Sequence, residues 1–163
     1  MKYDISALGN ALVDTQYMVD HDFLDEIGLE ADSMTLASAE EHSPIIDKLE
    51  SMGVESVSDC GGSATNSLVA ASYYGSKCHH VCRVANDEDG KKYLESLQKA
   101  GVQHIGYSKE DSEMPTGKCL IFVTPDAKRT MSSMLGISAY LGSKDINYDA
   151  INNSKIFNTL VNN

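Results

Sequence analysis

The sequence predicts an α/β protein in which helices flank a mostly parallel β-sheet. From Val54 onward, short apolar runs typical of strands alternate with segments whose apolar residues recur at helical spacing. Two of these helical segments end at Gly75 and Gly101, where a residue in the left-handed conformation is typical. Extended runs before Val54 and a late hairpin do not fit the alternation, so we expect them at the edge of the sheet or in a small separate sheet.

Length and charge limit the class of protein. A chain of 163 residues is enough for one domain, or for one compact domain with a small excursion. The net charge of -11 argues against nucleic acid or an anionic membrane surface as the main partner, because both favour clustered Lys and Arg. No apolar run reaches the length of a membrane span, and the N-terminus lacks the apolar block of a signal peptide. We therefore expect a cytoplasmic protein.

The N-terminal third is predicted to begin with a strand that ends at Gly9 and to continue as a second extended run. Ser38 and Glu41 have the capping-box spacing of a helix start, and apolar residues continue at helical spacing beyond them. Pro44 lies inside this helix, so we expect either a kink or a later start with Ser43 as the N-cap. The predicted elements of this region are strands over 5–9, 15–19 and 33–37, a short helix around 23–27, and a helix up to 53.

A glycine pair lies between a predicted strand and a predicted helix. The strand leads into Gly61 and Gly62, and Ser63 is the expected N-cap of the helix. The free amides at this helix start, with the side chain of Asn66 one turn in, suit a ligand rich in hydroxyl groups or negative charge. The alternative is a tight strand-to-helix turn that binds nothing.

Asp14 is a further candidate, because it follows closely after the strand that ends at Gly9. In open α/β sheets, ligands bind outside the carboxyl ends of the strands. We therefore expect Asp14, the glycine pair and Asn66 to share one pocket.

The rest of the chain continues the alternation and adds a β-hairpin with its turn over 125–128. Ser143 or Asp145 is expected to open a last short helix. The predicted elements are strands over 54–60, 77–84, 102–107, 118–124, 129–135 and 155–161, helices over 64–74 and from 86–90 to 100, and a surface loop over 108–115.

The four cysteines are expected to be reduced and buried, because the chain shows no secretory signal. The segment 78–82 reads Cys-His-His-Val-Cys, and both residue types are zinc ligands. It falls in a predicted strand, where side chains alternate between faces, and no second ligand pair stands at a zinc-site spacing. We expect a half-buried strand there and no metal site.

No complete catalytic motif is present in the sequence. Thr116-Gly117-Lys118-Cys119 superficially matches the end of a phosphate-binding loop, but the preceding glycine and the following hydroxyl residue are missing. The dinucleotide-binding glycine pattern and the Gly-x-Ser-x-Gly elbow are absent as well. The residues by themselves predict a pocket for a polar ligand and assign no catalytic residue.

Several segments together resemble the N-terminal half of the PfkB carbohydrate kinases, the family of ribokinase and adenosine kinase. The segments are Gly9-Asn10-Ala11-Leu12-Val13-Asp14, Gly61-Gly62-Ser63-Ala64-Thr65-Asn66-Ser67, Val84-Ala85-Asn86-Asp87-Glu88-Asp89-Gly90, Pro115-Thr116-Gly117-Lys118-Cys119 and the run from Thr124 to Met131. They occur in the family's order over nearly the whole chain, and they look more like the adenosine kinase branch than like ribokinase.

This resemblance implies a ribokinase-like fold for 1–163, with a small β-sheet lid formed by about 14–37 and 118–135 over the substrate. It implies a sugar or nucleoside as the ligand. Asp14 would hold sugar hydroxyls, because an ionised carboxylate makes strong charge-assisted hydrogen bonds to a diol. The residues implied to line the same pocket are Gly61, Gly62, Asn66, Asn10 and Arg129.

The sequence also departs from the family pattern. Family enzymes use ATP and Mg²⁺, an aspartate in a Gly-Ala-Gly-Asp segment and an Asn-x-x-Glu segment, and neither segment is present here. We therefore expect a truncated kinase that binds no cofactor tightly and is inactive alone, since phosphoryl transfer depends on those groups. The alternatives are a non-catalytic module that forms a homodimer through the lid sheet, because an open edge strand invites pairing, and a remnant that binds nothing.

Overall fold

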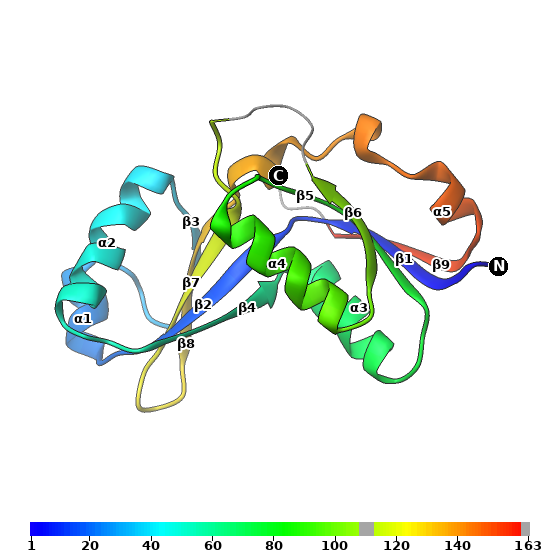
Figure 1. The fold of residues 1–163 in the computed structure, drawn as a ribbon. Coiled ribbons are helices and arrows are strands. Elements are labelled where there is room, and N and C mark those ends of the chain that lie inside the picture. Colours follow the sequence, from blue (N-terminus) through cyan, green and yellow to red (C-terminus); the bar gives the residue numbers. More distant parts are fainter. Residues whose placement is uncertain (108–112, 161–163) are drawn as a thin grey trace.

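The computed structural model describes residues 1–107 and 113–160, which form two β-sheets with helices packed against them (Figure 1). The α/β architecture predicted from the sequence is confirmed, as a parallel sheet and a separate mixed sheet. Most of the expected surface loop, residues 108–112, lies outside the described residues.

The parallel sheet has four strands in the order β6-β5-β1-β9, and each neighbouring pair is parallel. Every residue of β5 is buried, which corrects the expected half-buried strand. The reason is that both faces are covered: Cys82 lies in the core with α3 and α4, while Arg83 donates to the carbonyl of Tyr140 on the other side. The strands are β1 (Tyr3–Gly9), β5 (Cys78–Val84), β6 (Gln103–Tyr107) and β9 (Ser154–Leu160).

The mixed sheet has five strands in the order β3-β8-β7-β2-β4. The predicted hairpin is confirmed as the antiparallel pair β7 and β8. We had expected the strand before the glycine pair in the parallel sheet, but β4 pairs antiparallel with β2 and is an edge strand of the mixed sheet. The strands are β2 (Leu12–Met18), β3 (Met34–Leu36), β4 (Ser56–Gly61), β7 (Gly117–Val123) and β8 (Arg129–Met134).

Helices α1 (His21–Glu26) and α2 (Ala39–Ser51) cover one face of the mixed sheet and bury a core with Leu120 and Phe122. The later helix start at Ser43 is wrong, because α2 begins directly after Ser38. The Ser38 hydroxyl accepts from Glu41 N, and the Glu41 carboxylate accepts from Ser38 N at 2.7 Å. This capping box satisfies two first-turn donors, and Pro44 removes only one donor in the second turn.

Helices α3 (Ser63–Tyr73) and α4 (Glu88–Lys99) pack on one face of the parallel sheet, and Gly75 and Gly101 follow them with φ of 88° and 79°, as predicted. The expected Ser63 cap is wrong, because the N-cap of α3 is Gly62 and no side chain caps it. The predicted last helix starts later than Ser143 or Asp145. Those residues form the 3₁₀ helix η2 (Ser143–Asp145), and Asn147 caps α5 (Tyr148–Asn152) by accepting from Ala150 N.

Candidate ligand-binding site

Asp14 lies in the middle of β2, directly opposite Asp59 of β4 on one side and Cys119 of β7 on the other. The strand that ends at Gly9 is confirmed, but the expectation that Asp14 lies just beyond a strand end is wrong, because Asp14 belongs to the next strand, β2. The chain leaves β1 at Gly9 and enters the mixed sheet at Leu12, so that the carboxylate belongs to a face of the second sheet.

The side chain of Asp14 occupies the space next to Gly61. A Cβ atom at Gly61 would overlap the carboxyl carbon and both carboxylate oxygens of Asp14. Gly61 pairs with Leu12, two residues before Asp14 on the neighbouring strand, so the carboxylate leans diagonally over the glycine. The structure thus places two of the six predicted site residues in contact, and it explains why the second has no side chain.

Burial and two neighbouring charges of opposite sign shift the pKa of Asp14. Burial raises the pKa of Asp14 to about 6, the positive charge of Arg129 lowers it, and the neighbouring Asp59 raises it further. Arg129 is exposed at the start of β8, opposite Val123, which lies on the same face of β7 as Cys119. Arg129 and Asp14 therefore share one face of the mixed sheet.

That face lies opposite the one that α1 and α2 cover, and besides Asp14, Arg129 and a few polar residues such as Asp59 and Ser133 it carries an apolar cluster. Leu12, Cys119 and Ile121 form its buried centre, with further apolar side chains packed around them from β7, β8 and the residue after β8, namely Val123, Met131 and Leu135. A carboxylate set into an apolar face suits a ligand with one hydroxylated end and one flat, weakly polar end.

Gly62 brings two chain segments into backbone contact. Its φ is 96°, and a Cβ atom there would lie 2.5 Å from the carbonyl oxygen of Asn10. Its own carbonyl accepts from Asn66 N at 2.9 Å and so begins α3. The exposed Asn66 side chain lies one turn into this helix, as the sequence predicted. It is the backbone N–H of Asn66, and not its side chain, that makes this first bond of the helix.

Asn10 is buried and donates from Nδ2 to the carbonyl of Ser138 at 3.1 Å and to its hydroxyl at 3.3 Å. Ser138 belongs to the 3₁₀ helix η1 (Gly136–Tyr140), which follows β8. Asn10 therefore ties the end of β1 to the segment that leaves the mixed sheet, and its amide is held within the protein in this structure.

Two further glycines at the junction of the sheets were missed as site-forming residues. A Cβ atom at Gly117 would lie 2.6 Å from the carbonyl oxygen of Leu135 and 2.7 Å from that of Ala11, and one at Gly136 would overlap the carbonyl of Pro115. The sequence around Gly117 indicated a failed phosphate-binding loop and a segment shared with the family. Its close backbone contacts depend on segments distant in the chain, so they could not be read from that motif.

Asp87 belongs to the segment expected to open a helix, and it both caps that helix and binds a second segment of the chain. Its carboxylate caps α4 by accepting from Gly90 N at 2.7 Å, and it also accepts from the backbone and hydroxyl of Thr116 at 2.8 and 2.6 Å. Burial would raise the pKa of Asp87, but the hydrogen bonds from Thr116 and Gly90 outweigh it and the pKa is lowered. Asp87 thus links α4 to the start of β7.

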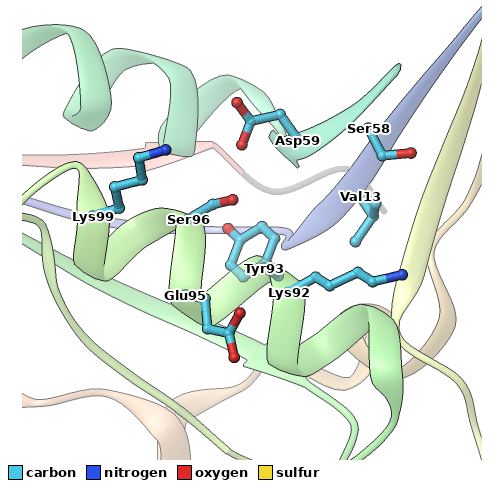
Figure 2. Close-up of a pocket in the computed structure, with 8 residues that line it drawn as sticks. All are labelled: Val13, Ser58, Asp59, Lys92, Tyr93, Glu95, Ser96 and Lys99. Carbon is cyan, nitrogen blue, oxygen red and sulfur yellow. The ribbon is translucent and has the colours of Figure 1, made fainter. Parts of the chain in front are cut away.

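A cavity away from the six predicted residues lies beside α4. The cavity in Figure 2, of about 270 Å³, lies between α4 and β4, on the face of the mixed sheet opposite Asp14. Val13 and Ser58 line it from the sheet, while Lys92 and Tyr93 are among the residues that line it from α4. Lys92 already pairs with Glu88 at 2.8 Å, and the other charges mix both signs, so this cavity favours no particular ligand.

The described residues offer no metal centre. Within 1–107 and 113–160, no group of three or more His, Cys, Asp or Glu side chains is placed to hold a metal ion. The segment 78–82 is a buried strand whose cysteines are free thiols. Along the same described stretch, no helix is both long and apolar enough to cross a bilayer.

Two sheets joined at a glycine-built junction, with a carboxylate over one of the glycines, make up an α/β fold with one candidate ligand-binding site. The family model of the pfkB family carbohydrate kinases matches residues 34–159. The chain belongs to this family, as the resemblance of its motifs implied.

Similarity to individual proteins agrees with this membership. The chain is 27% identical over 137 residues to adenosine kinase 1 of Arabidopsis thaliana and 30% identical over 88 residues to mouse ribokinase, covering 38% and 26% of those proteins and 82% and 53% of this chain. Among solved structures, adenosine kinase from Sinorhizobium meliloti superimposes with a TM-score of 0.82 at 29% identity over 98% of this chain. A probable sugar kinase from Rhizobium etli gives 0.83 at 27% over 97%.

The chain spans about half the length of these solved structures, 47% and 46% respectively, and a smaller share of the curated relatives.

Proposed function

We propose that this chain is the substrate-binding half of an ATP-dependent sugar or nucleoside kinase of the adenosine kinase type, and that it is inactive alone. The observation that carries the proposal is the Asp14 carboxylate seated over Gly61. A carboxylate that accepts from two neighbouring hydroxyls recognises a diol, and the absent side chain at Gly61 leaves the room that the Asp14 carboxylate occupies.

The surroundings of Asp14 favour a nucleoside over a bare sugar. Val123 and Met131, partly buried apolar side chains of this face, would contact the base of a nucleoside, while Asp14 would hold its ribose. Arg129 on the same face keeps the Asp14 carboxylate in its charged, hydroxyl-accepting form at neutral pH by opposing the effect of burial on its pKa. Asn66 and the Gly62 segment would contribute further polar contacts from the start of α3.

Phosphoryl transfer needs groups that this chain does not supply. In complete family enzymes, ATP donates the phosphoryl group and Mg²⁺ neutralises its charge. The Gly-Ala-Gly-Asp and Asn-x-x-Glu segments expected to serve them are absent from the sequence, and the described residues form no metal site. No catalytic step is therefore assigned to a residue of this chain, whose part is to bind and orient the hydroxylated substrate.

The test is calorimetric titration of the purified chain with adenosine, ribose and fructose, alongside an assay for ATP-dependent phosphorylation. Binding of one of these ligands that is lost in Asp14→Asn, together with no turnover, supports the proposal. Measurable turnover by the chain alone would refute the expected inactivity. Equal binding by Asp14→Asn and the unchanged chain would refute the role of Asp14.

A second candidate is a dimerisation module that uses the mixed sheet. The edge strand β3 is exposed, with Met34 and Leu36 at 53% and 56% exposure, and unpaired edges with apolar side chains invite pairing. Sedimentation of the chain at increasing concentration tests this candidate. A dimer that Leu36→Asp dissociates would support it, and a strict monomer would exclude it.

A further inference from the structure

A cavity of about 690 Å³ lies between α2, the connection from α1 to β3, and β3 itself. Figure 1 shows α2 and β3 at the end of the molecule away from the parallel sheet. The volume is within the roughly 300–1,000 Å³ of typical ligand pockets. Ser132 of β8 is among the lining residues, and the apolar ones are Ile27, Leu29, Leu36, Ala37, Pro44 and Ile45.

Acidic side chains dominate the charge of this cavity. Lys48 lines it, but Glu26 already holds the Lys48 ammonium in an ion pair. Glu40 and Glu41, in the first turn of α2, also line it and are exposed. Hydrogen bonds from its own backbone N–H and from Ser38 lower the pKa of Glu40, so it is ionised at neutral pH. The exposed part of the cavity therefore attracts a cation.

The edge of β3 beside the cavity has unpaired backbone groups. Ala37 N donates to the carbonyl of Ser133, and Met131 N donates to the carbonyl of Ser33, both at 2.9 Å. Successive peptide groups of a strand alternate in direction, so those of Met34 and Leu36 face away from β8. Among the described residues, β3 has no second neighbouring strand. An extended chain can therefore pair with its outer side.

We propose that β3 and this cavity bind an extended segment of a partner protein, in which an apolar residue is flanked by lysine or arginine. The segment adds a strand to the outer edge of β3, places its apolar side chain in the cavity and directs a basic side chain to Glu40. In such strand addition, main-chain hydrogen bonds provide affinity and pockets for alternate side chains provide specificity. Because β3 has only three residues, its backbone pairing is weak alone, and the cavity and its charge select the partner.

A second copy of this chain fits the same edge less well. The residues around β3 include Glu30, Asp32, Glu40 and Glu41, and the segment 30–41 contains no lysine or arginine. Two copies joined through β3 would bring these acidic residues together, and like charges across paired strands are destabilising. The net charge of -11 on each chain adds to the repulsion. A basic segment converts this repulsion into attraction.

The probe for the test is the synthetic peptide acetyl-Lys-Thr-Ile-Thr-Lys-amide. Its two lysines and its isoleucine project to one face of a strand, so the isoleucine can enter the cavity between two basic side chains. The matched control is acetyl-Glu-Thr-Ile-Thr-Glu-amide. Titration of the full chain, followed by nuclear magnetic resonance, should show saturable binding of the lysine peptide at least about tenfold tighter than that of the glutamate peptide.

Amide hydrogen exchange locates the bound peptide. At saturation with the lysine peptide, the amides of Met34 and Leu36 should exchange about tenfold more slowly than in the chain alone, because they gain acceptors. The amide of Thr35 should change little, since Thr35 lies between them and its peptide group faces β8. This alternating pattern distinguishes strand addition from binding in the cavity alone.

Matched variants of the chain separate the contributions. Leu36→Pro removes an outward N–H and leaves the hydrogen bonds to β8 in place, so it should weaken binding of the lysine peptide about fivefold. Glu40→Gln should weaken it about two- to fivefold, the usual effect of an exposed ion pair. Glu50→Gln is the control, because Glu50 is an exposed residue of α2 that does not line the cavity. Circular dichroism checks that each variant retains the fold.

Three outcomes overturn the proposal. The first is a lysine peptide that shows no saturable binding or binds no tighter than the glutamate peptide. The second is binding that leaves the exchange of Met34 and Leu36 amides unchanged, which would place the peptide elsewhere. The third is a dimer of the chain alone in which these two amides are protected, which would make a second copy the occupant. None of these outcomes bears on whether Asp14 binds a nucleoside, because no readout depends on one.

Discussion

The carboxylate of Asp14 occupies the space in which a side chain at Gly61 would begin. Glycine is therefore required at position 61, because any side chain there would overlap the Asp14 carboxylate. The energetic consequences of this contact can be tested without knowing the ligand.

Gly61→Ala should destabilise the chain by about 1–3 kcal/mol, the usual range for an overpacked site. Its φ is not in the left-handed region, so the effect comes from the overlap with Asp14 and not from backbone strain. In an Asp14→Ala background the overlap is gone, and the same substitution should have a much smaller effect. Urea unfolding of the four proteins in this double-mutant cycle measures the coupling, and additive effects would contradict the contact.

Asp14→Asn should raise the melting temperature at pH 7.5 while it removes ligand binding. The folded pKa of Asp14, about 6, lies above the ordinary value of 3.8 for an aspartate, so the folded state holds its proton more tightly than the unfolded state. The stabilisation that protonation provides is present in full below the unfolded pKa and is lost as pH rises from about 4 to 6. The gain from the variant should therefore disappear at pH 4, and Asp25→Asn, at an exposed carboxylate of α1, serves as the control.

Gly62→Ala should destabilise the chain more than Gly75→Ala. Both glycines have positive φ, 96° and 88°, so an alanine is strained at either position. Only at Gly62 would the new Cβ also lie 2.5 Å from the Asn10 carbonyl, whereas at Gly75 nothing lies within 4 Å. Gly75→Ala should cost about 1 kcal/mol, and the excess at Gly62, read from chemical denaturation, measures the close approach of the two backbones.

Stability should fall as the pH is lowered from about 6.5 to 4, because His79 and His80 are buried as neutral rings. Burial lowers the pKa of each to about 4, below the ordinary histidine value of 6.5, so the unfolded state takes up protons first as the pH falls. His80 accepts at Nε2 from Thr65 and donates at Nδ1 to the carbonyl of Ala7. This trend is opposite in sign to that of Asp14 and involves two groups. Urea midpoints at pH 7 and 5 should show it, and the exposed variant His21→Gln should leave it unchanged.

Ser38→Ala should destabilise the chain by about 1 kcal/mol, because Glu41 N loses its acceptor at the start of α2. Ser43→Ala is the matched control, since the structure gives Ser43 no capping role. Equal effects of the two substitutions on thermal unfolding would indicate that the helix starts later than the structure shows.

Much of the fold could be predicted from local sequence. The stops at Gly75 and Gly101, the Ser38 capping box and the hairpin of β7 and β8 all depend on residues close together in the chain. Expectations failed where a competing local choice decided the outcome. Asn147 and not Ser143 caps α5. Gly62 and not Ser63 is the N-cap of α3, at a position where the positive φ and the close contact with Asn10 allow only glycine.

The sequence by itself determined the family, the glycine pair and the candidate residues, because these are carried by ordered local motifs. Only the tertiary structure decided which sheet each strand joins. An apolar run does not encode its partner, so β4 could not be assigned to the mixed sheet in advance, and Asp14 could not be placed over Gly61. Those arrangements arise from pairing between strands distant in sequence, where register and packing across the two sheets choose among partners that are locally equivalent.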